Sequence, residues 1–103
     1  MKRIWIAYEP RVFREALVAV ISQLEGVEIV EDLSAGVDVG IFRLASTGLL
    51  QNFFHRTPQL ETKMVVFSAR GDRAFIRYPC EKNWTTVQPF GMPELLAEIT
   101  RSR

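Results

Sequence analysis

The chain has 103 residues, 48% of them hydrophobic, and its 13 basic and 12 acidic side chains leave a formal charge of +1. This length and apolar content are typical of one compact domain, so we expect a single domain over residues 1–103. The small net charge disfavours nucleic acid and membrane surfaces as direct partners. A single cysteine excludes an internal disulfide framework, and no signal peptide or membrane span is predicted, so we expect a cytoplasmic protein.

The first half of the chain alternates between strand and helix patterns. The continuous apolar run at residues 4–7 predicts a strand that is buried on both faces. Apolar residues recur at helical spacing over residues 10–24 and predict a helix. Two short β-rich segments follow at residues 27–30 and 37–42, and a second helix is predicted over residues 46–57.

The second half continues the alternation. Residues 64–67 predict a buried strand, residues 72–78 a short helix, and residues 84–87 a final strand. A last helix begins at Met92, with Pro93 in its first turn. Alternating strands and helices predict an α/β three-layer sandwich of the flavodoxin-like (CheY-like) class, with a mainly parallel five-stranded sheet in the order 2-1-3-4-5.

Four segments carry a family pattern: Ala7-Tyr8-Glu9-Pro10-Arg11-Val12-Phe13-Arg14-Glu15-Ala16-Leu17, Asp38-Val39-Gly40-Ile41-Phe42-Arg43-Leu44, Val65-Val66-Phe67-Ser68-Ala69, and Val87-Gln88-Pro89-Phe90 with Pro93-Glu94-Leu95-Leu96. In this order they resemble bacterial response-regulator receiver domains, with similarity over residues 4–99. The resemblance implies the flavodoxin-like fold predicted above. It also implies a role in bacterial signalling or regulation.

The resemblance places a degenerate receiver pocket in this chain. Receiver domains use two acidic residues to hold Mg²⁺ and an aspartate to accept a phosphoryl group. By the resemblance, Tyr8 replaces one metal-binding acid and Arg43 replaces the phosphoacceptor. The matching pocket positions are Tyr8, Glu9, Arg43, Ser68, Gln88 and Pro89. We therefore expect a pseudo-receiver that is not an enzyme, is not phosphorylated on aspartate, and needs neither Mg²⁺ nor another cofactor.

Arg43 suggests a new ion pair in this pocket. A partly buried carboxylate is costly unless it is paired, so we hypothesise that the Arg43 guanidinium pairs with Glu9. The alternative is that Arg43 points into solvent from the end of its strand.

The connection at residues 31–36 is too short for a crossover helix between parallel strands, so the second helix of the family is expected to be shortened or missing. One sheet face then lacks part of its cover, and we expect a homodimer with Trp5, Phe53 and Phe54 at the interface. Alternatively, these aromatic residues cover the gap themselves. A further alternative makes the second and third strands an antiparallel hairpin.

Two functions follow from these patterns. The first is a non-catalytic module that binds another protein or itself. The second is a small-ligand or nucleotide sensor at the carboxyl edge of the sheet, with Arg43, Ser68, Arg70 and Arg73 as anion-binding residues. An enzyme that uses Cys80 is a weaker third possibility, because nothing in the spacing pairs it with His55.

Overall fold

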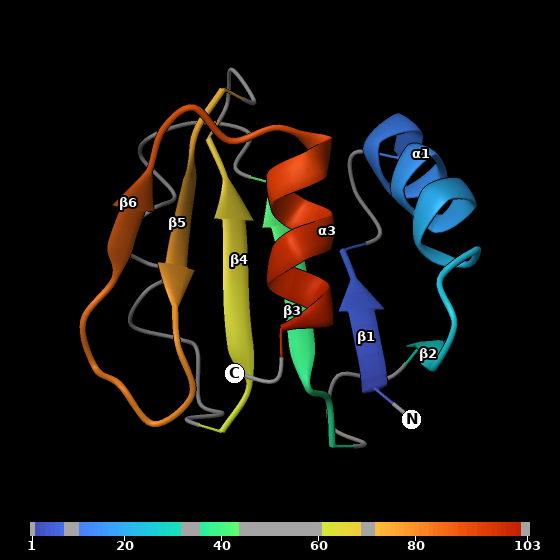
Figure 1. Ribbon diagram of the computed structural model, residues 1–103, viewed down its shortest axis with the longest axis horizontal. Coiled ribbons are helices and arrows are strands. Elements are labelled where there is room, and N and C mark those ends of the chain that lie inside the picture. The colour runs from blue at the N-terminus through green and yellow to red at the C-terminus, as the bar shows by residue number, and fades with distance from the viewer. Residues whose placement is uncertain (1, 8–10, 32–35, 44–60, 69–71, 102–103) are drawn as a thin grey trace.

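The computed structural model describes residues 2–7, 11–31, 36–43, 61–68 and 72–101. Within these ranges the chain forms one six-stranded sheet and two helices, α1 (Arg11–Ile21) and α3 (Met92–Thr100) (Figure 1). The strands are β1 (Lys2–Ile6), β2 (Val27–Val30), β3 (Val39–Arg43), β4 (Lys63–Phe67), β5 (Ala74–Arg77) and β6 (Thr85–Val87). Neither described helix is long and apolar enough to cross a membrane.

The sheet is mixed. Its strand order is β2-β1-β3-β4-β5-β6, in which β2, β1, β3 and β4 run parallel. The strand β5 breaks this pattern, because it runs antiparallel to both of its neighbours, β4 and β6. The predicted flavodoxin-like, mainly parallel five-stranded sheet is therefore wrong.

The turn between β4 and β5 gives the physical reason. The backbone N–H of Ser68 donates to the carbonyl of Arg73 at 3.0 Å, so the chain closes a tight turn directly after β4. A crossover to a parallel neighbour needs roughly a dozen residues or more, whereas a tight turn returns the chain antiparallel. The short helix predicted over residues 72–78 is accordingly wrong, since Ala74–Arg77 forms the returning strand β5.

The strands β2 and β3 flank β1 on either side and are both parallel to it. They are not neighbours in the sheet, so the alternative of an antiparallel hairpin between them is also wrong. The predicted helix over residues 46–57 lies outside the described residues, as do residues 32–35 of the short connection. The question of a shortened second helix therefore stays a prediction.

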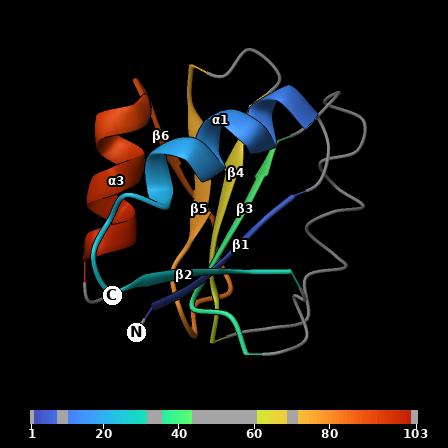
Figure 2. The same ribbon diagram turned by 90° about the vertical axis from the view of Figure 1, so that its right-hand side faces the viewer.

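Both described helices pack on the same face of the sheet (Figure 2). Their buried residues recur four positions apart, at Leu17 and Ile21 in α1 and at Leu95 and Ile99 in α3, which places each pair on one side of its helix. They meet alternate residues of the strands to form the core, including Ile4, Ile6, Val39, Ile41, Val65, Ala74 and Ile76.

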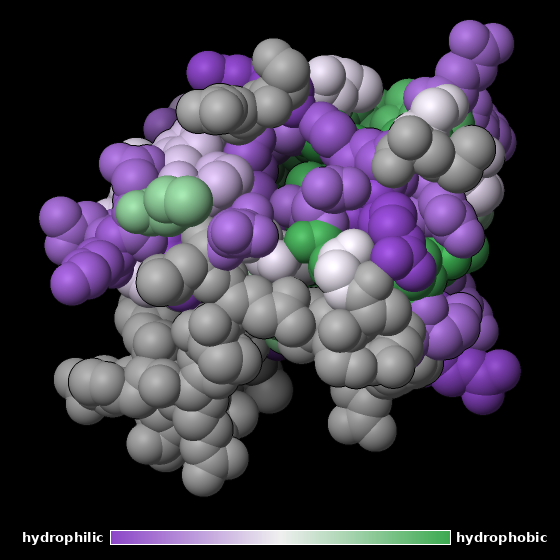
Figure 3. All heavy atoms as spheres, turned by 90° about the horizontal axis from the view of Figure 1, so that it is seen from below, coloured by the Kyte–Doolittle hydropathy of each residue, from purple (hydrophilic) through white to green (hydrophobic). Residues whose placement is uncertain are grey.

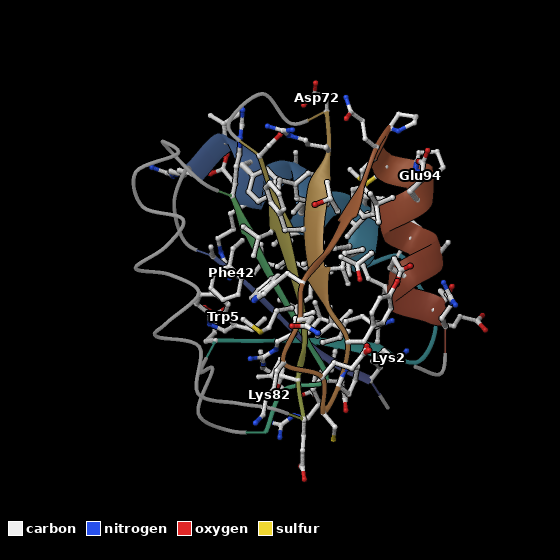
Figure 4. The ribbon with its side chains drawn as sticks, turned by 90° about the vertical axis from the view of Figure 1, so that its left-hand side faces the viewer. Lys2, Trp5, Phe42, Asp72, Lys82 and Glu94 are labelled. Carbon is white, nitrogen blue, oxygen red and sulfur yellow. The ribbon has the colours of Figure 1, made fainter. Side chains whose placement is uncertain are left out.

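The opposite face carries a second set of apolar side chains. Trp5 and Phe42 point to the side away from α3 (Figure 4), and their ring centroids are 5.0 Å apart. Gly40 of β3 lies beside Trp5 of β1, Met64 of β4 lies beside Gly40, and both Gly40 and Met64 are buried. Phe53 and Phe54, the other two residues of the predicted dimer interface, lie outside the described residues.

Gly40 provides a test of this packing. A Cβ atom at Gly40 would lie 3.2 Å from the Phe42 ring and 3.3 Å from the Met64 sulfur, closer than ordinary contact. We expect Gly40→Ala to reduce the free energy of unfolding by about 1–3 kcal/mol, measured by urea denaturation. Gly91→Ser is the control, because a Cβ there has its nearest neighbour at 3.6 Å and serine is a favourable N-cap residue. Equal stability of the two variants would contradict this account of the Gly40 contact.

Candidate functional site

The predicted receiver pocket is brought together only in part. Arg43 ends β3, and Ser68 follows the neighbouring strand β4 at the same edge of the sheet. The buried Ser68 hydroxyl donates to the Asp72 carboxylate at 3.2 Å, so this hydroxyl stabilises the turn into β5. Tyr8 and Glu9 lie outside the described residues, and the ion pair between Glu9 and Arg43 stays a hypothesis.

The remaining residues of that pocket are separated by the sheet itself. Gln88 and Pro89 are exposed and follow β6, and the peptide bond between them is cis. Because β5 lies between β4 and β6, Gln88 is two strands, or about 10 Å, removed from the end of β4. Arg73 is exposed with its guanidinium 5.7 Å from the centre of the Phe75 ring, and Arg70 lies outside the described residues. Arg43, Ser68 and Arg73 lie at this edge of the sheet, and their use as an anion site together with Arg70 stays a prediction.

A groove does open beside Arg43, at the carboxyl ends of the parallel strands. Its cavity of about 250 Å³ is lined by Phe13, Ala16, Leu17, Arg43, Phe67, Gly91 and Met92. We call it the carboxyl-edge groove. Its lining comes from the first half of α1, the ends of β3 and β4, and the start of α3, and it is mostly apolar.

A row of aromatic rings supports this groove. The Phe13 and Phe67 rings are 5.3 Å apart, the Phe67 and Phe90 rings are also 5.3 Å apart, and both pairs meet edge to face. The Arg43 guanidinium lies 5.7 Å from the centre of the Phe13 ring, at a distance typical of a cation–π contact. The half-buried Arg43 thus places a fixed positive charge next to an apolar hollow.

A larger cavity lies at the opposite end of the sheet, where the parallel strands begin. It has a volume of about 600 Å³ and is lined by Lys2, Asp38, Val39, Glu61, Lys63, Tyr78, Pro79, Cys80, Glu81 and Arg101. We call it the amino-edge cavity. Figure 3 looks onto this end of the molecule and shows mostly hydrophilic residues, with hydrophobic atoms visible between them.

One residue of the lining, Lys63, belongs to a buried ion pair. Lys63 begins β4, and its ammonium donates to the Glu98 carboxylate at 3.2 Å and to the Glu98 carbonyl at 3.0 Å. Only 3% of the Lys63 side chain and 10% of the Glu98 side chain are exposed. This pair joins the sheet to the last turn of α3, since Glu98 belongs to that helix.

Four further hydrogen bonds, made by three side chains, complete the cluster. The Glu98 carboxylate also accepts hydrogen bonds from the Tyr78 hydroxyl at 3.3 Å and from the Arg101 guanidinium at 3.1 Å. The Lys2 ammonium donates to the carbonyls of Ile99 and Arg101 at the end of α3, and Figure 4 shows Lys2 beside that end. Ammonium groups at the carboxyl end of a helix complement its dipole and satisfy carbonyls that lack partners within the helix.

The cluster shifts two pKa values. Burial lowers the pKa of Lys63 from its ordinary value of 10.5, and the positive charges of Lys2 and Arg101 act in the same direction, against the hydrogen bond and charge of Glu98. Burial raises the pKa of Tyr78 above its ordinary value of 10.0, and the Glu98 carboxylate raises it further. Tyr78 therefore keeps its proton and remains a donor to Glu98 at neutral pH.

Neither Lys63 nor Glu98 is among the site residues that the sequence predicts. A lysine before an apolar strand is usually a solvated flanking charge, so Lys63 gave no signal of its own. Glu98 did carry a signal, because it lies three positions after Leu95 and one before Ile99, on the apolar side of the predicted last helix. An acidic residue on that side needs a buried cationic partner.

The described residues contain no group of three His, Cys, Asp or Glu side chains that could hold a metal ion. Cys80 is exposed in the turn after β5, with a positive φ of 67°, and His55 lies outside the described residues.

Comparison of the chain with protein-family models, curated proteins and solved structures finds no match. Nothing in these comparisons supports the receiver resemblance, which stays a prediction. The function must therefore be argued from the two cavities.

The Glu98 contacts predict a large loss of stability when the carboxylate is removed. Glu98→Ala leaves the Lys63 ammonium buried without its ion-pair partner, and we expect the free energy of unfolding to fall by about 3–5 kcal/mol. Glu28→Ala, at an exposed position of β2, is expected to change it by less than about 0.5 kcal/mol. The double variant Lys63→Met with Glu98→Leu should recover much of the loss in urea denaturation. A Glu98→Ala protein as stable as Glu28→Ala would refute this role.

The raised pKa of Tyr78 predicts its alkaline titration. In a Tyr8→Phe variant Tyr78 is the remaining tyrosine, and its phenolate absorbance should appear at a midpoint above 10.0 in the folded protein and near 10.0 in denaturant. Because the folded pKa is the higher one, this group's contribution to stability is complete below pH 10.0 and is lost as the pH rises through the folded pKa. The same midpoint in both states would contradict the burial of this phenol beside Glu98.

Proposed function

We propose that this chain is a non-catalytic protein-interaction module that binds a partner segment in the carboxyl-edge groove. The observation that carries the proposal is the apolar hollow between α1 and α3 with the Arg43 guanidinium fixed at its side. The expected partner presents one apolar side chain next to an acidic residue. The apolar side chain fills the hollow, and the carboxylate meets Arg43.

The size of the groove favours a side chain over a whole small molecule. Its volume of about 250 Å³ lies below the roughly 300–1,000 Å³ of small-molecule pockets. Protein interfaces, in contrast, draw most of their affinity from one or a few anchor side chains that enter a preformed pocket. The rigid row of Phe13, Phe67 and Phe90 provides such a preformed pocket.

The surface around the groove extends the apolar contact. Val12 is 79% exposed, and it lies one helical turn before Ala16, which lines the groove. A large apolar side chain that is this exposed next to an apolar hollow is typical of an interaction surface.

The charges near the groove select an acidic partner. Arg43 supplies the positive charge in the lining, and α1 and α3 both begin here, so the positive ends of two helix dipoles open on the same region. The Glu94 carboxylate accepts the N–H of Gly91 at 3.3 Å and caps the start of α3, which reduces the positive field at that helix end.

The chemistry of the lining supports a binding role over catalysis. Among the described residues, the lining includes neither a hydroxyl or thiol nucleophile nor a carboxylate or imidazole base, and a guanidinium does not act as a base. The resemblance to receiver domains places the signalling pocket at this same edge, so it agrees with the proposal by analogy only.

Peptide selection tests the proposal. A displayed library of random peptides is selected on the intact protein, and the enriched sequences are expected to combine an acidic residue with a neighbouring aromatic or aliphatic one. Ala16→Glu should weaken these peptides by about tenfold or more in fluorescence anisotropy, because it places a carboxylate in the groove. Ala19→Glu is the matched control, since Ala19 is also exposed on α1 but does not line the groove, and we expect no more than about a twofold effect.

Two outcomes overturn the proposal. Equal binding of the selected peptides to both variants would place the interaction elsewhere. If peptides fail to bind but inorganic phosphate or a nucleotide raises the melting temperature of the wild type and not of Arg43→Gln, the sensor function replaces the interaction module.

A further inference from the structure

We propose that the amino-edge cavity binds a zwitterionic small molecule, an amino acid with an apolar side chain. Its carboxylate would lie against Lys2, Lys63 and Arg101, its ammonium group against an acidic residue of the rim, and its side chain between Val39, Tyr78 and Pro79. This site is separate from the carboxyl-edge groove and does not depend on the proposed interaction.

The size of the cavity is the first argument. Its volume of about 600 Å³ lies within the roughly 300–1,000 Å³ that small-molecule pockets occupy. The amino-edge cavity is also more than twice as large as the carboxyl-edge groove, which measures about 250 Å³.

A group of three cations in the lining is the second argument. Lys2, Lys63 and Arg101 all line the cavity, and among the described residues Glu98 is the carboxylate that pairs with Lys63 and with Arg101. The charges of Lys2 and Arg101 both lower the pKa of Lys63, so the three cations lie close enough to repel one another. A bound carboxylate relieves this repulsion and adds charge-assisted hydrogen bonds.

The Arg101 guanidinium has more N–H donors than its contact with Glu98 uses. A guanidinium has five N–H donors, and the contact with Glu98 is made through one nitrogen, Nη1, of Arg101. The Arg101 side chain is also 61% exposed, so it is accessible from the cavity mouth.

The opposite charge on the rim is the third argument. Asp38, Glu61 and Glu81 line the same cavity and are exposed. Asp38 already accepts the N–H of Arg3 at 2.8 Å, which leaves Glu61 and Glu81 as the better partners of an ammonium group. These carboxylates repel a simple anion, and the described residues give no cluster that could hold a metal ion. A molecule with one charge of each sign can meet both the cationic and the acidic residues of the lining.

The apolar part of the lining completes the ligand class. Val39 is buried, Tyr78 and Pro79 are half-buried, and β4 lies between Val39 and these two residues. The Tyr78 hydroxyl is held by Glu98 and the Lys63 ammonium lies 5.3 Å from the centre of its ring, so the ring is fixed and its remaining exposed part can contact an apolar side chain.

Three molecules with one apolar body test the proposal in calorimetric titrations of the intact protein. They are L-phenylalanine, which has both charges, 3-phenylpropanoate, which has only the carboxylate, and 2-phenylethylamine, which has only the ammonium group. We expect L-phenylalanine to bind saturably with a Kd of about 1 mM or lower, and each analogue to bind about tenfold more weakly or worse. Amide chemical shifts should change at Val39, Tyr78, Cys80 and Arg101 and not at Ala16 of the groove.

Charge variants assign the two ends of the ligand. Arg101→Gln should weaken L-phenylalanine and 3-phenylpropanoate alike, because both place a carboxylate against the three cations of the lining. The double variant Glu61→Gln with Glu81→Gln should weaken L-phenylalanine but not 3-phenylpropanoate. Glu28→Gln, an exposed substitution on β2, is the control and should change neither.

Three results would overturn the proposal. One is the absence of saturable L-phenylalanine binding up to about 10 mM. Another is binding of 3-phenylpropanoate as tight as that of L-phenylalanine, which would leave a plain anion site. The third is a set of chemical-shift changes at the carboxyl-edge groove in place of the cavity. None of these results bears on peptide binding at the groove, so the two proposals fail separately.

Discussion

The contact between Lys63 and Glu98 fixes α3 on the sheet, and both cavities depend on that helix. The first residues of α3, Gly91 and Met92, line the carboxyl-edge groove, and Arg101 just after its end lines the amino-edge cavity. A buried ion pair contributes little net stability, because desolvation cancels most of the attraction. Its main effect here is positional. A placement of α3 that moved the Glu98 carboxylate away from the Lys63 ammonium would leave buried charges without a partner, and this cost favours the observed placement.

Local patterns in the sequence were sufficient to predict the two described helices and the strand β4. The pairs Leu17 with Ile21 and Leu95 with Ile99 have helical spacing, and both segments are helices whose buried residues include those pairs. The apolar run Met64–Phe67 lies in β4, and every residue of that strand is buried. In these cases one feature of the sequence, apolar periodicity or an apolar run, sets both the element and its burial.

The same patterns failed where a short segment fits two structures equally well. Residues 72–78 hold only a few apolar side chains, which is too short a stretch for periodicity to separate a helix from a strand. The decision comes from the turn, in which the amide of Ser68 bonds the carbonyl of Arg73 and the hydroxyl of Ser68 bonds the carboxylate of Asp72. Such a turn depends on backbone contacts that composition does not reveal, so the fifth strand and the mixed sheet were not predictable from the residues alone.

The direction of β5 explains why Gln88 is separated from Ser68 and how the amino-edge cavity gains part of its lining. Because β5 runs antiparallel, its last residue lies at the edge where the parallel strands begin, which brings Tyr78 and the turn that follows it next to Lys2 and Lys63. The same strand occupies the place beside β4 and moves β6 outward, so Gln88 no longer lies next to Ser68. The antiparallel direction of β5 thus moves Gln88 away from the end of β4 and places Tyr78 in the lining of the amino-edge cavity. The cationic groups of that cavity come from β1, β4 and the end of α3, whereas its acidic and aromatic groups come from the segments just before β3 and β4 and just after β5, and the fold alone brings them together.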